Sequence, residues 1–195
     1  MAKTWYIDGT FKVVKKPFYQ LLSRHGFVRS GDDLKQIPLC FCIMSGKKKR
    51  HYKKVFQSIK DLLPETKIKS FVADFEKGHW QGLRAAFGTL QIHGCAFHFG
   101  QALWRKVQEL GLQRVYQEHD SMYKLLRKVF ALPLLPADDI PPSFAELKRR
   151  VDPEAVNVLS FLRCVEDNWI HNDIWTVDSW SVYGRSTRTN NDVEG

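Results

Sequence analysis

The chain has no long hydrophobic run and few cysteines, and these two shortages exclude several classes of protein. No stretch approaches the roughly 18–20 consecutive apolar residues that cross a membrane, and the first residues lack the pattern of a signal peptide. The four cysteines stand at irregular spacings, which gives no disulfide framework of the kind found in small secreted proteins. We therefore expect a soluble intracellular protein.

Several common catalytic motifs are also missing. The sequence contains no GxSxG, no P-loop and no GxGxxG, so serine hydrolases, P-loop nucleotidases and dinucleotide-binding enzymes have no motif support. What the sequence does have is 44% hydrophobic and 13% aromatic residues over 195 positions. That composition is enough for one sizeable domain with an inserted subdomain, and it excludes general disorder.

Positive charge is concentrated in the first third of the chain. Residues 1–63 hold 14 Lys or Arg against 4 Asp or Glu, whereas the rest of the chain is nearly neutral. The densest stretch is GKKKRHYKK over residues 46–54. Such a patch suits a polyanion such as nucleic acid, although a solvated loop or a nuclear localisation signal is also compatible with it. The candidate DNA-binding residues are Lys47, Lys48, Lys49, Arg50, Lys53, Lys54, Arg185 and Arg188.

The pattern of apolar residues predicts three strands, then helix, strand, helix, strand, and a mainly helical second half. Runs rich in β-branched and aromatic residues between turn formers predict strands, and apolar residues at helical spacing predict helices. The predicted strands are residues 3–14, 18–28, 37–45, 68–76 and 90–100. The helical pattern covers residues 50–63, 78–88, 101–132, 142–151 and 153–170.

This order predicts an α/β protein with a ribonuclease-H-like mixed five-stranded sheet. The first three strands would be antiparallel, and the fourth and fifth would be added through helical crossovers. We expect residues 1–100 to form this core and 101–180 a helical insertion. Residues 181–195 would begin a C-terminal catalytic helix that is cut short. In such a sheet the first and fourth strands are neighbours.

Three acids could then meet at one end of the sheet. Asp8 interrupts an apolar strand, where a carboxylate is costly without a partner or a cation. Asp74 stands where the fourth strand ends, and Glu194 stands near a helix start. Three carboxylates suit Mg²⁺, and two such ions about 3.5–4 Å apart can serve an in-line displacement at phosphorus. Taken singly, each acid fits a turn or capping residue better, and only the joint placement of the three favours a metal site.

Four short blocks resemble the transposase domain of Mutator-like elements (MULE transposases). They are WYIDGTFK at 5–12, ADFE at 73–76, GCAFHFGQ at 94–101 and RTNNDVEG at 188–195, in the order found in that family. The resemblance implies that Asp8, Asp74 and Glu194 form a DDE catalytic triad that binds Mg²⁺ or Mn²⁺ in a two-ion site. It also implies that the insertion between Asp74 and Glu194 is helical.

The third block carries the family's Cys-x-x-His motif as Cys95 and His98. Cys164 and His171 could complete a zinc site, but their spacing exceeds the usual interval between paired ligands. A buried thiol with a hydrogen-bonded histidine is the favoured interpretation, so we expect no zinc. Most of the six tryptophans are expected to pack in the core or at its rim, and Trp175 and Trp180, in an irregular stretch before Arg185 and Arg188, are the best placed to stack on unpaired bases.

Three functions follow from these features. The leading hypothesis is a DNA transposase catalytic domain that hydrolyses a phosphodiester at transposon ends and transfers the strand to target DNA. The alternatives are an inactive relic or host-recruited protein that binds DNA, and a ribonuclease-H-type nuclease. As partners we expect terminal inverted repeats and target DNA, in the nucleus and without a membrane; a homodimer is left open. Because the family's zinc module is missing here and the helix of Glu194 is short, we expect this chain alone to cut poorly.

Overall fold

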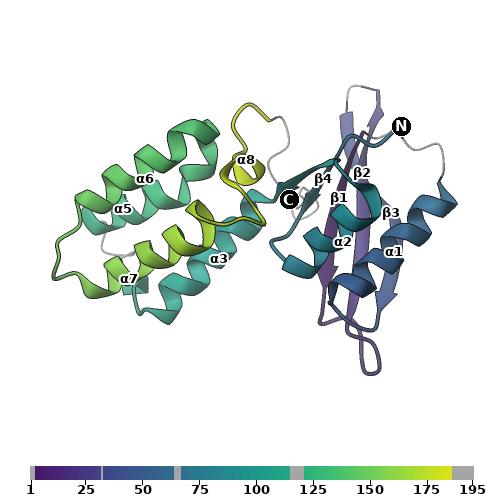
Figure 1. Cartoon of the computed structure of the whole chain (residues 1–195), viewed down its shortest axis with the longest axis horizontal. Helices are drawn as coiled ribbons and strands as arrows, with labels where there is room; N and C mark the ends of the chain where they lie inside the picture. Colours follow the sequence, from purple (N-terminus) through teal and green to yellow (C-terminus); the bar gives the residue numbers. More distant parts are fainter. Residues whose placement is uncertain (1–2, 32, 64–66, 115–120, 186–195) are drawn as a thin grey trace. The chain divides into compact units, whose positions relative to one another are not determined.

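The computed structural model describes residues 3–31, 33–63, 67–114 and 121–185. Of these residues, those up to Cys95 form one compact unit, and those from Ala96 onward form a second. The first unit contains the sheet and two helices, and the second is helical (Figure 1).

The first unit is built on a mixed five-stranded sheet in the order β3-β2-β1-β4-β5. Its strands are β1 (Thr4–Thr10), β2 (Gln20–Ser30), β3 (Asp33–Met44), β4 (Ser70–Ala73) and β5 (Gln91–Gly94). The strands β1, β2 and β3 pair antiparallel, whereas β4 pairs parallel with both β1 and β5. The predicted α/β class, the mixed sheet and the pairing of the first strand with the fourth are therefore confirmed.

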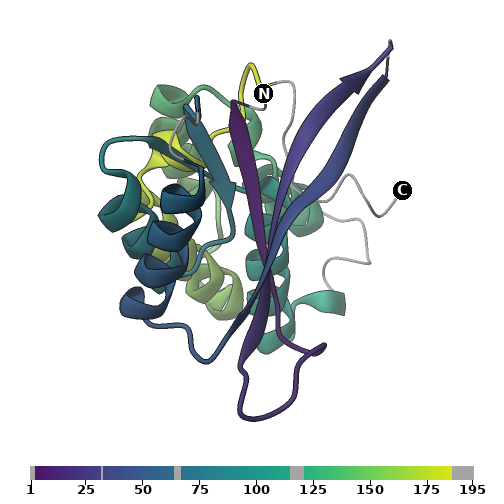
Figure 2. The ribbon, with the colours of Figure 1, turned by 90° about the vertical axis from the view of Figure 1, so that its right-hand side faces the viewer.

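The strands β2 and β3 form a long twisted ribbon (Figure 2). Gly31, which follows β2, has a φ of 64°, a conformation that glycine adopts without steric cost. The pairing shifts by one residue between Arg24 and His25, where a bulge bends the ribbon. Beyond the bulge, Arg24 pairs with Cys40 and Leu22 with Cys42.

Two helices, α1 (Lys49–Leu62) and α2 (Lys77–Phe87), lie side by side against one face of the sheet (Figures 1 and 2). Aromatic side chains fill the layer between them and the strands. The Phe87 ring lies 4.9 Å from that of Phe71 and 6.0 Å from that of Trp5, measured between centroids. Burial of such rings is a main source of folding free energy in this unit.

The fifth strand is shorter than the sequence pattern predicts. It ends at Gly94, and α3 (Ala96–Glu109) begins two residues later, so the prediction of a strand over 90–100 is wrong for its second half. A short apolar run cannot be assigned to strand or helix by periodicity alone. In the structure Phe99, Leu103 and Val107 recur every four residues and are buried along one side of this helix.

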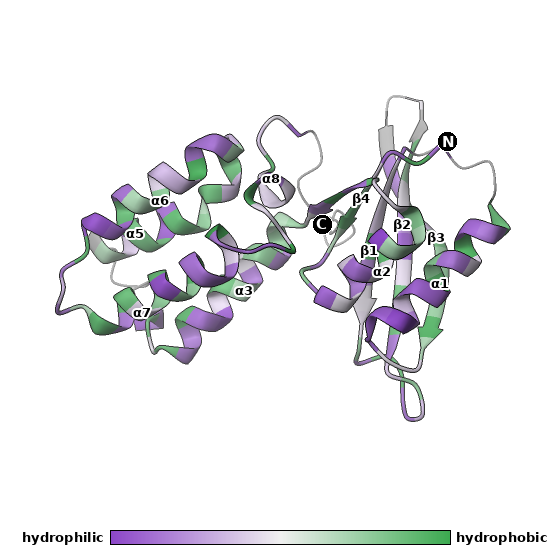
Figure 3. Cartoon of the chain, viewed as in Figure 1, coloured by the Kyte–Doolittle hydropathy of each residue, from purple (hydrophilic) through white to green (hydrophobic). Residues whose placement is uncertain are grey.

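The second unit is made of helices around an aromatic core. After α3 come α5 (Ser121–Phe130), η1 (Leu132–Leu134), η2 (Ala137–Asp139), α6 (Ile140–Arg149), α7 (Val156–Val165), the π-helix η3 (Glu166–Ile170) and α8 (Val177–Trp180). The Phe99 ring stacks on Trp180, with centroids 5.0 Å apart, and meets Trp169 edge-on at 4.7 Å. Hydrophilic and hydrophobic residues alternate along the helices (Figure 3), as expected for helices with one buried side. No helix within the described ranges is long and apolar enough to cross a membrane.

Candidate active site

Asp8 lies on the central strand of the sheet. It pairs with Ser23 of β2, and the Ser23 hydroxyl donates a hydrogen bond to the Asp8 carbonyl oxygen at 3.4 Å. The neighbouring residue Ile7 is buried, whereas Asp8 is partly exposed. His25, two residues along β2 from Ser23, has its pKa lowered by burial, and the negative charge of Asp8 opposes that shift. The Asp8 carboxylate therefore lies close to His25, at the point where β1 passes from buried to partly exposed residues.

Asp74 follows directly after β4, beside the part of β1 that carries Asp8. The parallel pairing of the two strands runs up to Ile7 opposite Ala73, so each acid is the next residue after that pair. Adjacent strands lie about 4.8 Å apart, and residues in register on parallel neighbours are therefore close. The structure thus places two of the three acids that the sequence selected at the same end of two neighbouring strands.

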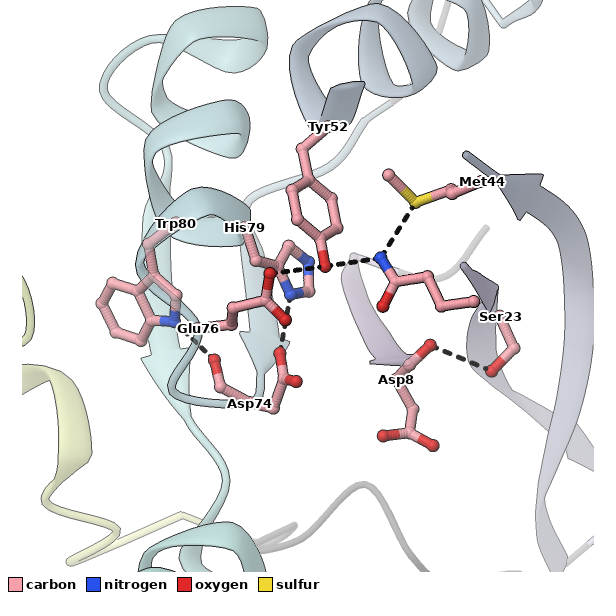
Figure 4. A network of polar contacts seen from close by, with 9 residues as sticks. Asp8, Ser23, Met44, Tyr52, Asp74, Glu76, His79 and Trp80 are labelled. Atoms are coloured by element: carbon pink, nitrogen blue, oxygen red, sulfur yellow. Dashed lines mark hydrogen bonds and ion pairs between the residues drawn. The ribbon is translucent and has the colours of Figure 1, made fainter. Parts of the chain in front are cut away.

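The orientation of Asp74 is set by two side chains of α2. His79 Nδ1 lies 2.7 Å from Asp74 Oδ1, and the indole nitrogen of Trp80 donates to the Asp74 carbonyl oxygen at 2.7 Å (Figure 4). His79 is 1% exposed and Asp74 17% exposed. An imidazole that keeps its proton on Nδ1 would donate to the carboxylate and fix its rotamer. Neither His79 nor Trp80 was selected from the sequence.

A third carboxylate, Glu76, lies near Asp74. The Tyr52 hydroxyl donates to Glu76 Oε1 at 3.0 Å and accepts a hydrogen bond from Gln20 Nε2 at 2.6 Å. Burial raises the pKa of Glu76, and the negative charge of Asp74 adds to that rise. Burial also raises the pKa of Tyr52, so its hydroxyl keeps its proton and remains a donor. Figure 4 shows Asp74, Glu76 and His79 gathered around the end of the Tyr52 side chain.

Glycines in α2 allow α1 to come close enough to build this network. A Cβ atom on Gly82 would lie 2.4 Å from the Tyr52 Cβ, and one on Gly78 would lie 2.4 Å from the Lys47 carbonyl oxygen. The close approach lets the Tyr52 ring stack on His79, with centroids 4.9 Å apart and planes 10° apart. The imidazole is therefore held between aromatic packing and the Asp74 carboxylate.

The candidate DNA-binding residues of the first unit lie at the start of α1 and just before it. All six are exposed, namely Lys47, Lys48, Lys49, Arg50, Lys53 and Lys54. Lys47 is close enough to Glu76 for its positive charge to oppose the rise in the Glu76 pKa. The basic segment thus begins beside the acids. Arg185 belongs to the second unit, where its guanidinium donates to the Asp178 carbonyl oxygen at 3.3 Å.

The third acid, Glu194, lies outside the described residues, as does Arg188. Within the described part of the chain, no group of three or more His, Cys, Asp or Glu side chains is placed to hold a metal ion. Asp8 and Asp74 by themselves offer hard oxygen ligands of the kind that Mg²⁺ and Mn²⁺ take from proteins.

The residues considered for zinc are spread over both units. Cys95 is fully buried after β5, and its amide donates to the Ala73 carbonyl oxygen at 3.0 Å. His98 lies on α3, Cys164 on α7, and His171 just after η3. The absence of zinc stays a prediction.

The expectation that Trp180 could stack on unpaired bases is wrong, because Trp180 is 1% exposed and packs on Phe99. The nearby Trp175 is partly exposed, and its indole nitrogen donates to the Asn168 carbonyl oxygen at 3.0 Å. Spacing in an irregular stretch did not reveal which tryptophan belongs to the core.

Comparison with known proteins agrees with the resemblance found in the sequence. The model of the MULE transposase domain matches residues 4–102, which include the whole sheet, Asp8, Asp74, Cys95 and His98. No curated protein matches the chain. The matched part covers more than half of the chain, and the chain therefore belongs to the MULE transposase domain family.

Proposed function

We propose that this chain is the catalytic part of a DDE-type DNA transposase with a ribonuclease-H-like core. The observation that carries the proposal is that Asp8 and Asp74 each follow directly after Ile7 and Ala73, the last paired residues of two neighbouring parallel strands, within a MULE transposase domain. A transposase of this type hydrolyses a phosphodiester at the transposon end and joins the freed 3′-hydroxyl to target DNA. In this proposal the second, helical unit is an insertion between the second acid and the third.

Asp8, Asp74 and Glu194 would hold Mg²⁺ or Mn²⁺. When bound, such ions supply electrostatic stabilisation of the charge that develops on the phosphorus oxygens. The chain's own contribution is orientation. His79 and Trp80 fix Asp74 from α2, and strand pairing fixes Asp8. Rigid placement of carboxylates by hydrogen-bonded neighbours is what a metal-dependent site requires.

DNA would be held by the exposed basic residues around the start of α1. Each Lys or Arg that neutralises a phosphate releases counterions, so this contact gives affinity without sequence specificity. Lys47 lies near Glu76, which itself lies near Asp74. A DNA backbone bound along the basic residues at the start of α1 would therefore lead toward these acids. The proposed cutting site and the proposed binding surface are therefore adjacent parts of one unit.

Manganese-dependent nicking of duplex DNA tests the proposal, in this chain and in a form extended past Gly195. In the extended form we expect Asp8→Asn, Asp74→Asn and Glu194→Gln each to abolish nicking while leaving DNA affinity within about twofold, because basic residues supply most of the binding. A variant that nicks as fast as the parent would remove that acid from the site. DNA binding without nicking in any form would support the inactive DNA-binding protein instead.

A further inference from the structure

Two cysteines on β3 form a close pair outside the candidate active site. Cys40 and Cys42 are separated by one residue, so their side chains lie on the same face of the strand. Their sulfur atoms are 3.5 Å apart and hydrogen-bonded, and both residues are partly exposed. The other two cysteines, Cys95 and Cys164, lie on other elements.

A buried arginine lies directly beside this pair. Arg24 is opposite Cys40 in the β2–β3 register, is 7% exposed, and stacks on the Trp5 ring at 3.5 Å from its centroid. Its Nε and Nη1 atoms are buried and have no hydrogen-bond partner among the described residues. Burial lowers the pKa of Arg24, and the two cysteine sulfurs oppose that shift. A buried guanidinium with unused donors stabilises an anion placed next to it.

The two thiols have different roles in this arrangement. Burial, together with the hydrogen bond to Cys40, raises the pKa of Cys42 to about 11. Cys42 therefore keeps its proton and can donate it to the Cys40 sulfur. Cys40 can accept this hydrogen bond and lies beside the positive charge of Arg24, so both groups can stabilise negative charge on its sulfur during a reaction.

We propose that Cys40 and Cys42 form a reversible oxidation site for hydroperoxides, with Arg24 stabilising the attacking thiolate. The Cys40 thiolate attacks one peroxide oxygen, the O–O bond breaks, and the leaving oxygen is protonated, which leaves a sulfenic acid on Cys40. Cys42 sulfur then attacks Cys40 sulfur, the S–S bond forms, and the S–O bond breaks. The Cys42 proton leaves with that hydroxyl as water. Both sulfurs are oxidised, and the two peroxide oxygens are reduced.

The position of the pair on an edge strand permits this reaction and makes it reversible. Residues two apart on an extended strand have Cα atoms about 6.8 Å apart, at the upper end of the range that a disulfide spans. Closing the bond therefore requires β3 to bend. The strand can do so because it lies at the end of the sheet order, with β2 as its one partner strand in the described sheet. A disulfide formed in this way is easily reduced.

Peptide mapping after peroxide treatment of the native chain tests the proposal. Trypsin releases both cysteines in the single peptide of residues 36–47, whereas Cys95 and Cys164 fall in other peptides and serve as internal controls. We expect this peptide to lose the mass of two hydrogens and to resist alkylation. Dithiothreitol should restore its original mass and its reactivity toward alkylation. The proposal would be overturned if both cysteines could still be alkylated after peroxide treatment, or if they formed disulfides with Cys95 or Cys164 instead.

Two further comparisons separate a built site from ordinary thiol chemistry. Arg24→Met should slow oxidation of the peptide at least about fivefold, and Arg24→Lys should restore most of the rate, because the cation favours the thiolate. The urea-unfolded chain should also oxidise more slowly than the native one. Equal rates for Arg24→Met and the parent, or for folded and unfolded chain, would contradict the proposal. None of these outcomes depends on transposase activity.

Discussion

The two units of the chain place their polar side chains differently. In the sheet unit the buried residues include Gln20, Arg24 and His79, and the first and last of these belong to the network around Asp74 and Glu76. The helical unit buries mainly apolar and aromatic side chains, and its ion pairs, such as Lys106 with Glu109, lie at the surface. Buried polar groups cost free energy unless they are paired. The comparison therefore agrees with the proposal that the sheet unit holds the reacting groups, whereas the helical unit has a mainly apolar core.

The largest expected change in stability comes from the core of the helical unit. Trp180→Ala removes a ring that is 1% exposed and stacks on Phe99, so we expect a loss of about 3–5 kcal/mol in the free energy of unfolding. Chemical denaturation measures it. Affinity for Mn²⁺ should be unchanged in the folded fraction, and a fall in that affinity would contradict the separation of roles between the units.

Two glycine substitutions compare helix packing in the two units. Gly82→Ala would place a methyl group 2.4 Å from the Tyr52 Cβ and should cost about 1–3 kcal/mol, because α1 has to move. Gly100→Ala on α3 meets nothing within 4 Å and should instead stabilise by about 0.5–1 kcal/mol, since alanine favours helix. Thermal unfolding checks both. A stabilising Gly82→Ala would show that the two helices of the sheet unit do not need their close approach.

A smaller, pH-dependent change is expected at Glu76. Because its pKa is raised by burial, the folded chain holds this proton more tightly than the unfolded chain. Its contribution to stability is therefore lost as pH rises from the ordinary glutamate pKa through the raised one. Without divalent cations, Glu76→Gln should melt higher than the parent at neutral pH, and the difference should vanish in acid. Glu154→Gln, an exposed control in the helical unit, should leave the pH dependence unchanged. If the melting temperature of Glu76→Gln depends on pH in the same way as that of the parent, burial does not raise the pKa of Glu76.

The smallest change in stability is expected at the basic surface. Replacing Lys47, Lys48, Lys49 and Arg50 by glutamine should alter stability by less than about 0.5 kcal/mol, because all four are exposed. The salt dependence of DNA binding should nevertheless become flatter, since fewer counterions are released. The control is Lys124→Gln with Lys128→Gln on α5, which should leave the slope nearly unchanged. If the salt dependence of DNA binding has the same slope in both variants, the DNA does not bind along the basic residues at the start of α1.

Much of the sheet could be predicted from the sequence, because each strand contains β-branched or aromatic residues and lies between turn formers. The adjacency of Asp8 and Asp74 followed from strand order alone. The contacts that hold Asp74 could not be predicted in the same way. The bond from His79 depends on where α2 begins, and the Tyr52–Glu76 bond depends on how closely α1 approaches α2. The second of these is a tertiary distance that depends on the close packing of α1 against Gly78 and Gly82, and a sequence pattern does not encode it.

The errors in the sequence prediction have a similar origin. The end of β5 was predicted wrongly because the apolar run around Cys95 is compatible with a strand as well as with a helix. Trp180 was a candidate for stacking on bases because it stands in an irregular stretch, but it packs on Phe99, which is far away in the sequence, and on Trp169. In both places packing against distant residues decides the structure, and local propensity does not.

We propose that Asp8 and Asp74 together hold a divalent cation, and calorimetric titration of the chain with Mn²⁺ tests this most directly. We expect Asp8→Asn and Asp74→Asn each to weaken Mn²⁺ binding at least about tenfold, because the amide keeps the shape of the side chain and removes its charge. Asp138→Asn, an exposed control in the helical unit, should bind like the parent. If Asp8→Asn and Asp74→Asn both bind Mn²⁺ as tightly as the parent, these acids do not form a metal site and the proposed chemistry is wrong.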